Sequence, residues 1–205
     1  MISRLSLLSL VLAILCGRAI TKADEPAPLR LRSGPHLLID DHLIGEQSFL
    51  LRTVNNPKKR PKPVIPGGET YRISQPYVSV VRDAQKGIFR MWYEVPAPGQ
   101  LGLARMPRDR YVSRLAGPNV GRLLTKPLVL KARSLTVNAN VRGTGRVRLL
   151  DTKRKPLDGF GWVEFKGDSV EYKIDWRNRL SRVSGQVVRL EFQLKDCQLF
   201  GFDLH

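Results

Sequence analysis

The chain has 205 residues, 42% of them hydrophobic, and a formal net charge of +17. This length suffices for one or two domains with a buried core, and the ordinary hydrophobic content excludes a chain that is disordered throughout. The excess of Lys and Arg over Asp and Glu predicts attraction to polyanions such as acidic or sulfated polysaccharide, an anionic cell surface or nucleic acid. A basic surface that only aids solubility is the alternative.

Residues 1–23 have the pattern of a secretory signal peptide. Arg4 precedes an apolar run from Leu5 to Cys16, and small residues up to Ala23 allow cleavage before Asp24. The run is too short to span a bilayer core of about 30 Å comfortably, and a retained membrane anchor is the alternative reading. The sequence therefore predicts a secreted or periplasmic protein that has no membrane contact once the signal is removed.

Removal of the signal leaves Cys197 as the one cysteine, so no internal disulfide is possible. Cys197 lies in the apolar stretch "KDCQLFGF" without a neighbouring His in the sequence, and we predict a buried structural thiol. The three histidines show no metal-ligand spacing, and neither a metal nor a cofactor is expected. The chain also lacks an esterase elbow, a phosphate loop and any nucleotide fingerprint, so specific nucleic-acid binding is not predicted.

The first part of the chain predicts short strands. Candidates are "HLLIDDHLIG" (36–45) and "SFLLRTV" (48–54), followed by "NNPKKRPKPVIPGGET" (55–70). The last segment predicts a loop with a solvated basic turn, because each proline removes a hydrogen-bond donor from a ladder. "ISQPYVSVVRD" and "GIFRMWYEV" predict a β-hairpin whose turn ends at Gly87, and "PAPGQ" (96–100) predicts a linker.

From Leu101 onward, short alternating strands separated by Gly and Asp turns predict a β-sandwich of the jelly-roll kind. "RGTG" (142–145) predicts a tight turn between two strands, and "WRNRLSRVSG" (176–185) predicts a turn or a single helical turn. Separate strands are expected at 101–113 (a pair), 122–130, 134–141, 146–151, 162–165, 169–176, 187–194 and 198–204. We expect an all-β fold with an N-terminal β segment at 24–100 and a β-sandwich domain at 101–205.

These motifs resemble a family of secreted bacterial glycoside-hydrolase-like proteins, in which a five-bladed furanosidase-type β-propeller precedes a C-terminal β-sandwich. The N-terminal likeness rests on "HLLIDDHLI", "RTVNNP…KPVIP" and "FRMWYE", which correspond to the approach to the propeller and its first blade. The C-terminal likeness rests on "LGLARMPRDRYVS", "LLTKPLVL", "LTVNANV", "GDSVEYKIDW" and "GQVVRLEFQLKDCQLFGF", and covers most of residues 101–205. The resemblance implies N-terminal hairpins like a first propeller blade.

The chain departs from that family between "FRMWYE" and "LGLA". Several blades separate these motifs in the family, whereas only "VPAPGQ" separates them here. The chain therefore resembles an internally deleted member that lacks most of the propeller, and with it the walls of the active site.

Asp40 and Asp41 are the candidate catalytic residues. Glycoside hydrolysis generally needs two carboxyl groups about 5 to 9.5 Å apart across the scissile bond. Neighbours on a regular strand point to opposite faces, so at most one of these two serves, and a turn capped by the Asp pair is the alternative. Asp83, which begins a hairpin turn, and Glu94 are the other carboxylates of the blade-like part.

Trp162, Tyr172 and Trp176 are the candidate carbohydrate-binding residues, because aromatic faces stack on sugar rings, with core or edge packing as the alternative. We expect a secreted, non-catalytic sandwich protein related to the accessory region of such hydrolases, which binds polysaccharide or persists as a folded remnant. A residual glycosidase using Asp40 or Asp41 and a basic surface protein that binds polyanions are the alternatives. The apolar faces of the N-terminal hairpins need burial, by docking on the sandwich or by self-association.

Overall fold

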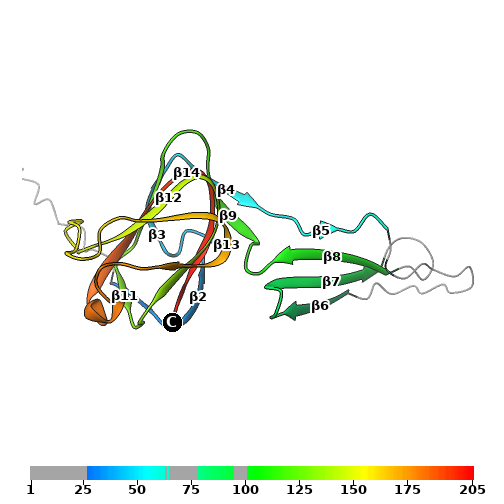
Figure 1. Ribbon diagram of the computed structural model, residues 1–205, viewed down its shortest axis with the longest axis horizontal. Helices are drawn as coiled ribbons and strands as arrows, with labels where there is room; N and C mark the ends of the chain where they lie inside the picture. Colours follow the sequence, from blue (N-terminus) through cyan, green and yellow to red (C-terminus); the bar gives the residue numbers. More distant parts are fainter. Residues whose placement is uncertain (1–26, 63, 65–77, 95–100) are drawn as a thin grey trace, which may run out of the picture.

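The computed structural model describes residues 27–62, 64, 78–94 and 101–205, so the predicted signal peptide and the linker at 96–100 lie outside the described residues. Almost all of the regular structure is β, which confirms the predicted all-β fold. Figure 1 shows a sandwich-like part and a second, smaller sheet that extends away from it. A single 3₁₀ turn, η1 (Leu180–Val183), lies where the sequence predicts a turn or one helical turn.

The sandwich-like part is one branched sheet of ten strands. They are β1 (Leu29–Leu31), β2 (Gly34–Leu37), β3 (Ile44–Ser48), β4 (Leu50–Val54), β9 (Val112–Ala116), β10 (Gly121–Thr125), β11 (Leu128–Leu130), β12 (Leu135–Leu150), β13 (Val163–Ile174) and β14 (Val187–Leu204). β12 runs along one edge of β14 and carries β13 on its far side. The short strands β10, β9 and β2 follow one another along the other edge of β14.

The longest strand, β14, bends back on itself. The rings of Phe192 and Phe202 stack with their centroids 6.4 Å apart, although ten residues of straight strand would span about 33 Å. The bend lies at Asp196, which has a φ of 46° and whose N–H donates to the carbonyl of Gly117 (2.9 Å). β12 bends at the facing position, where its pairing with β14 shifts register between Val141 and Thr144. The two halves of the β12–β14 ladder therefore face each other as two layers.

One hydrophobic core fills the space between these layers. Apolar side chains recur along β12 and β14, so each long strand offers a continuous apolar face, and its removal from water drives the closure of the bent ladder. The core members from the two strands are Leu135, Val137, Ala139, Val141, Val147, Leu149, Val188, Leu190, Phe192, Leu194, Cys197, Leu199, Phe202 and Leu204.

The structure corrects the hairpin turn predicted at "RGTG". Residues 142–145 continue β12 through its bend, so the two strands predicted on either side of them are one strand. The strands predicted at 187–194 and 198–204 likewise belong to the single strand β14. Glycine suits a bulge as well as a turn, so a Gly-rich interruption of an alternating pattern does not reveal whether the chain reverses or bends.

The second sheet is antiparallel and has the order β5–β8–β7–β6. Its strands are β5 (Lys58–Lys59), β6 (Val78–Asp83), β7 (Ile88–Glu94) and β8 (Leu101–Pro107). β6 and β7 confirm the predicted hairpin, and Gly87 has a φ of 59° in its turn. β5 is a correction, because two residues of the predicted basic loop pair with β8; an edge position is where a strand tolerates neighbouring prolines.

The hydrogen-bonded sheets do not follow the domain boundary predicted between residues 100 and 101. β1 to β4 precede that boundary but pair with strands of the sandwich, while β8 follows it and pairs within the second sheet. The second sheet is an excursion of the chain between β4 and β9, whose residues Val54 and Val112 are paired neighbours. Linker-like composition does not distinguish a boundary between domains from a connection between two strands of one sheet.

The strand β6 forms one edge of the second sheet. Val80 and Val81 on it are about half exposed, at 54% and 49%. Three of the apolar hairpin residues, by contrast, are half-buried: Leu37 in β2 of the sandwich, and Phe89 and Met91 in β7. Ile39, next to β2, is 42% exposed. Self-association through the N-terminal hairpins stays a prediction.

Two arginines hold the segment between β8 and β9 against the sandwich. Arg110 is buried and forms an ion pair with Asp168 (2.5 Å). Arg108 contacts Glu171 and lies 3.9 Å from Asp203. Burial raises the pKa of Asp203, against the opposing effect of the Arg108 charge. The exit from the second sheet is thus tied to β13 and β14 by charge.

Gly143→Ala tests the bend of the ladder. A Cβ at position 143 would lie 2.5 Å from the carbonyl oxygen of Lys195, a backbone atom. The strands would have to separate, so we expect the free energy of unfolding to fall by about 1–3 kcal/mol in urea denaturation. Gly117→Ala is the matched control, since a Cβ there meets no atom within 4 Å, and we expect a change below about 0.5 kcal/mol. Equal effects of the two substitutions would contradict this account of the bend.

Candidate functional site

Asp40 and Asp41, the candidate catalytic residues, lie in the bend between β2 and β3. The Asp40 carboxylate accepts a hydrogen bond from the backbone N–H of His42 (2.9 Å), the contact of an Asx turn. The buried Arg114 forms an ion pair with Asp41 (2.8 Å) and donates to the backbone carbonyl of Asp40 (2.7 Å). These contacts are those of the structural turn that the sequence offered as the alternative. Their partners are a backbone amide and an arginine rather than a second carboxylate.

Asp83 also has a structural contact, since it accepts a hydrogen bond from the backbone N–H of Lys86 (3.1 Å) in the hairpin turn. The side chain of Glu94 lies outside the described residues.

Glu171 and Asp203 are two carboxylates that sequence reasoning did not single out. Both approach the same nitrogen, Nη2 of Arg108, from β13 and β14. A cation therefore joins them, whereas a glycosidase leaves the space between its acid and its base open for the sugar. No sequence signal relates them, because the bend of the ladder decides which residues of the two strands meet Arg108.

Tyr172 and Trp176, two of the candidate sugar-binding residues, pack partly buried against the core. The Tyr172 ring tilts against Phe165, with 6.3 Å between the ring centroids. Trp176 meets Phe160 edge to face at 5.8 Å, and its indole N–H donates to the carbonyl of Gly161 (3.0 Å). Both rings thus have the packing role that the sequence left open, and Trp176 borders a hollow as well.

The hollow beside Trp176 has a volume of about 300 Å³ and a basic lining. Lys173 forms an ion pair with Asp175 (2.8 Å). Among the described residues, no carboxylate is ion-paired with the other two cations of the lining, Arg133 and Arg179. An anionic group entering this hollow would meet two guanidinium groups next to an aromatic ring.

A second hollow, of about 610 Å³, adjoins the first and shares Arg133 with it. Serine hydroxyls and further basic groups line it: Ser33, Lys131, Arg133, Ser181, Ser184 and His205. Of the described side chains that line the two hollows, four are Lys or Arg and one, Asp175, is a carboxylate. The pair forms a basic surface with hydroxyl donors, which we call the double hollow.

The third candidate aromatic residue, Trp162, lies among arginines on the outer face of the sandwich. The guanidinium carbons of Arg148 and Arg146 lie 4.3 and 4.6 Å from its ring centroid. The β12–β13 register pairs Val147 with Val163, which places Arg148 across from Trp162. These cation–π contacts occupy ring surface that a sugar platform would leave open.

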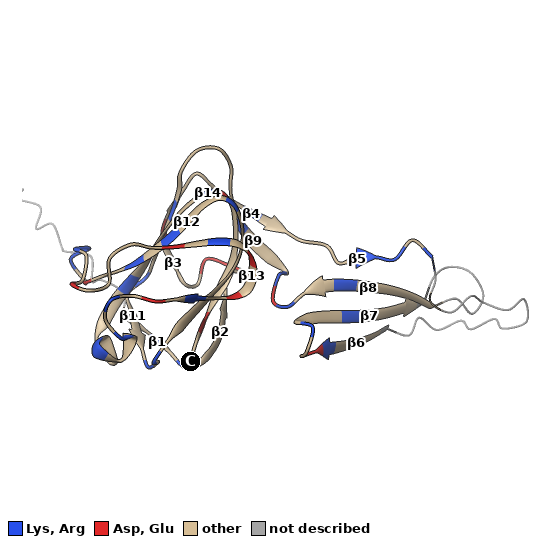
Figure 2. Ribbon diagram, viewed as in Figure 1, with Lys and Arg blue, Asp and Glu red and all other residues tan. Residues whose placement is uncertain are grey.

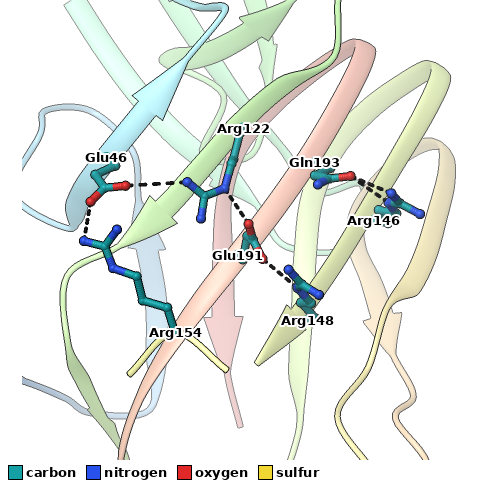
Figure 3. A network of polar contacts seen from close by, with 7 residues as sticks. All are labelled: Glu46, Arg122, Arg146, Arg148, Arg154, Glu191 and Gln193. Carbon is teal, nitrogen blue, oxygen red and sulfur yellow. Dashed lines mark hydrogen bonds and ion pairs between the residues drawn. The ribbon is translucent and has the colours of Figure 1, made fainter. Parts of the chain in front are cut away.

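Figure 3 shows a chain of alternating charges on this outer face. Arg154 and Arg122 both contact Glu46, and Arg122 and Arg148 both contact Glu191 at 2.5 and 2.6 Å. The side chain of Glu191 is only 3% exposed. A buried carboxylate needs charged or hydrogen-bonding partners, and Arg122 and Arg148 supply them to Glu191 on the central strand.

The sequence indicates that this strand has a polar face, but it does not predict which carboxylates the arginines of that face contact. Arg146 and Arg148 alternate with Val147 and Leu149, which indicates a strand with one polar face. The carboxylate that contacts Arg148, Glu191, belongs to a strand far away in the sequence, and no local pattern predicts this contact.

Cys197 is buried at 1% exposure, as predicted, and burial raises its pKa to about 12. Among the described residues, no group of three or more His, Cys, Asp or Glu side chains could hold a metal ion. Among the described residues, no helix is long and apolar enough to cross a membrane.

No protein-family model, curated protein or solved structure matches the chain. The likeness to glycoside-hydrolase-like proteins therefore stays an expectation from the sequence motifs.

The Cys197 thiol should be inert in the folded protein. Only the thiolate reacts with a disulfide reagent, and a pKa of about 12 leaves almost none of it at pH 8. We expect the protein without its signal segment to react with such a reagent at pH 8 only after guanidinium unfolds it. Rapid labelling of the folded protein would contradict the buried position.

The double variant Arg122→Gln/Arg148→Gln tests whether Glu191 depends on its two arginines. Leaving this buried carboxylate without a cation should cost about 3 kcal/mol or more of the free energy of unfolding. Arg154→Gln is the control, because its pair with Glu46 is exposed and should contribute at most about 1 kcal/mol. Chemical denaturation at pH 7 measures both, and a loss in the double variant no larger than in the control would refute the dependence.

Proposed function

We propose that this chain is a secreted, non-catalytic β-sandwich protein that binds an acidic polysaccharide in the double hollow, and that it is related to the accessory region of glycoside-hydrolase-like proteins. The observation that carries the proposal is the lining of the double hollow: Arg133, Arg179 and Lys131 without a paired carboxylate among the described residues, beside the ring of Trp176.

The chemistry of the lining suits sugar acids. Arginine binds a carboxylate or sulfate through paired N–H donors, and lysine adds a compact charge. An aromatic ring at the edge of such a hollow can contact the apolar face of a sugar, and serine hydroxyls can bond to its hydroxyl groups. Because two hollows adjoin at Arg133, a chain of several sugars fits the arrangement better than a single small ligand.

The carboxylates support a binding role rather than hydrolysis. Asp40 and Asp41 hold a bend, and Glu171 and Asp203 share Arg108. A residual glycosidase using Asp40 or Asp41 remains the alternative that the sequence raised, and release of reducing sugar from an acidic polysaccharide, lost in the Asp40→Asn or Asp41→Asn variant, would favour it.

A second candidate function is binding of polyanions without sugar specificity. The observation in its favour is the spread of charge: Figure 2 shows Lys and Arg on both the sandwich and the second sheet, and they outnumber Asp and Glu by 35 to 18. Such binding would depend on total charge rather than on the double hollow.

The test is binding of polygalacturonate and chondroitin sulfate oligomers, with neutral dextran as the uncharged comparison, measured by calorimetry. Arg133→Gln/Arg179→Gln should weaken binding at least about tenfold, because a hydrogen bond to a charged group contributes roughly 1.5–3 kcal/mol. The matched control is Lys86→Gln/Arg105→Gln, which removes the same charge from exposed positions of the second sheet and should leave affinity within about twofold.

If both double variants lost the same affinity for the oligomers, the chain would bind polyanions without sugar specificity, and the double hollow would not be the binding site. A second arm at about 0.5 M salt screens exposed charges over roughly 5 Å. Sugar contacts in the hollow should preserve measurable binding there, whereas a purely electrostatic complex should dissociate.

A further inference from the structure

Arg146 is the one arginine in Figure 3 that has no carboxylate partner among the described residues. Its Nε and Nη2 both donate to the side-chain oxygen of Gln193, at 3.0 and 2.6 Å. A guanidinium has five N–H donors, so this contact positions the group and leaves Nη1 available. The amide nitrogen of Gln193 is a further donor, because its oxygen is the atom that Arg146 uses.

The nearest carboxylate in the strand register does not neutralise this charge. Glu164 lies across from Arg146 on β13, is exposed, and forms no ion pair among the described residues. On the other side, the row continues through Gln193 to Arg122 on β10. Arg122 directs its charge to Glu46 and Glu191. Arg146 therefore adds a further positive charge to a network in which three arginines already face two carboxylates.

Trp162 and the neighbouring strand hold Arg146 and Arg148 in place. Both guanidinium groups lie against the Trp162 ring, and Arg148 is also fixed by its 2.6 Å contact with Glu191. Each arginine has thus lost most of its side-chain freedom before any ligand arrives, which lowers the entropic cost of binding.

We propose that Arg146, Arg148 and Gln193 form a binding site for a sulfate or phosphate monoester group, with Trp162 as its wall. The tetrahedral oxyanion offers three acceptor oxygens, which match the free N–H groups of two guanidiniums and one amide. The site lies on the outer face of β12 and β14, separate from the double hollow, and it does not depend on the function proposed there.

The experiment titrates the protein with glucose 6-sulfate, glucose 6-phosphate and neutral glucose at constant ionic strength, and follows tryptophan fluorescence and heat. We expect one ester to bind and to change the fluorescence of Trp162, whereas glucose does not bind. The ester that binds more tightly identifies whether the site prefers a sulfate or a phosphate monoester. Absence of binding by both esters overturns the proposal.

Arg146→Gln should weaken ester binding about tenfold or more, since it removes a charge-assisted hydrogen bond. Arg105→Gln, an exposed cation of the second sheet, is the control and should bind as the native protein does. Equal affinity of the two variants overturns the proposal.

Glu164→Gln is a second test, in which we expect the affinity for the ester to rise. A variant that merely failed to fold could not give this result. Removing this neighbouring negative charge, which repels an anionic ligand, should tighten ester binding severalfold. Arg133→Gln/Arg179→Gln should leave ester binding unchanged, which separates failure of this site from failure of the double hollow. Unchanged affinity in Glu164→Gln, or loss of ester binding in the double-hollow variant, contradicts the assignment to Arg146.

Discussion

The contact between Phe192 and Phe202 is the interaction on which the rest of this structure depends. It joins two halves of one strand, and it exists because β14 and β12 bend together near Asp196 and Thr144. That bend produces the two layers and the single core between them. It also places the short strands in order along β14. Apolar burial between the halves offsets the local cost of a residue with positive φ at the bend.

The same bent ladder arranges the charges of the protein. A central strand has neighbours on both edges, so its outward residues are crowded, and Glu191 is covered by arginines from β10 and β12. The arginines of this network outnumber its carboxylates, and Arg146 contacts Gln193 instead of a carboxylate. The double hollow gathers further cations near the end of β13 and in the segment before β12. Two groups of cations thus stand out from the generally basic surface, and each of them adjoins a tryptophan.

Features that depend on sequence neighbours could be predicted. The hairpin ending at Gly87, the turn at Asp40, the buried Cys197 and the single helical turn at residues 180–183 are of this kind. The bend at residues 142–145 could not, because a bulge and a hairpin turn use the same residues. The candidate sites followed the same division: aromatic residues could be named as candidates, but the packing of Trp176 and the arginines around Trp162 depend on strand pairing across long separations.

The pairing of Val54 with Val112 has a consequence for chain length. The sandwich fixes where the intervening polypeptide leaves and where it returns, and these two points are already adjacent. Closing a longer loop between adjacent ends costs only slightly more entropy, since the cost grows with the logarithm of length. The position therefore meets the geometric condition for domain insertion, and anything from a short turn to a large module could occupy it without altering a strand register. The junction "VPAPGQ" lies within this length-tolerant part of the chain.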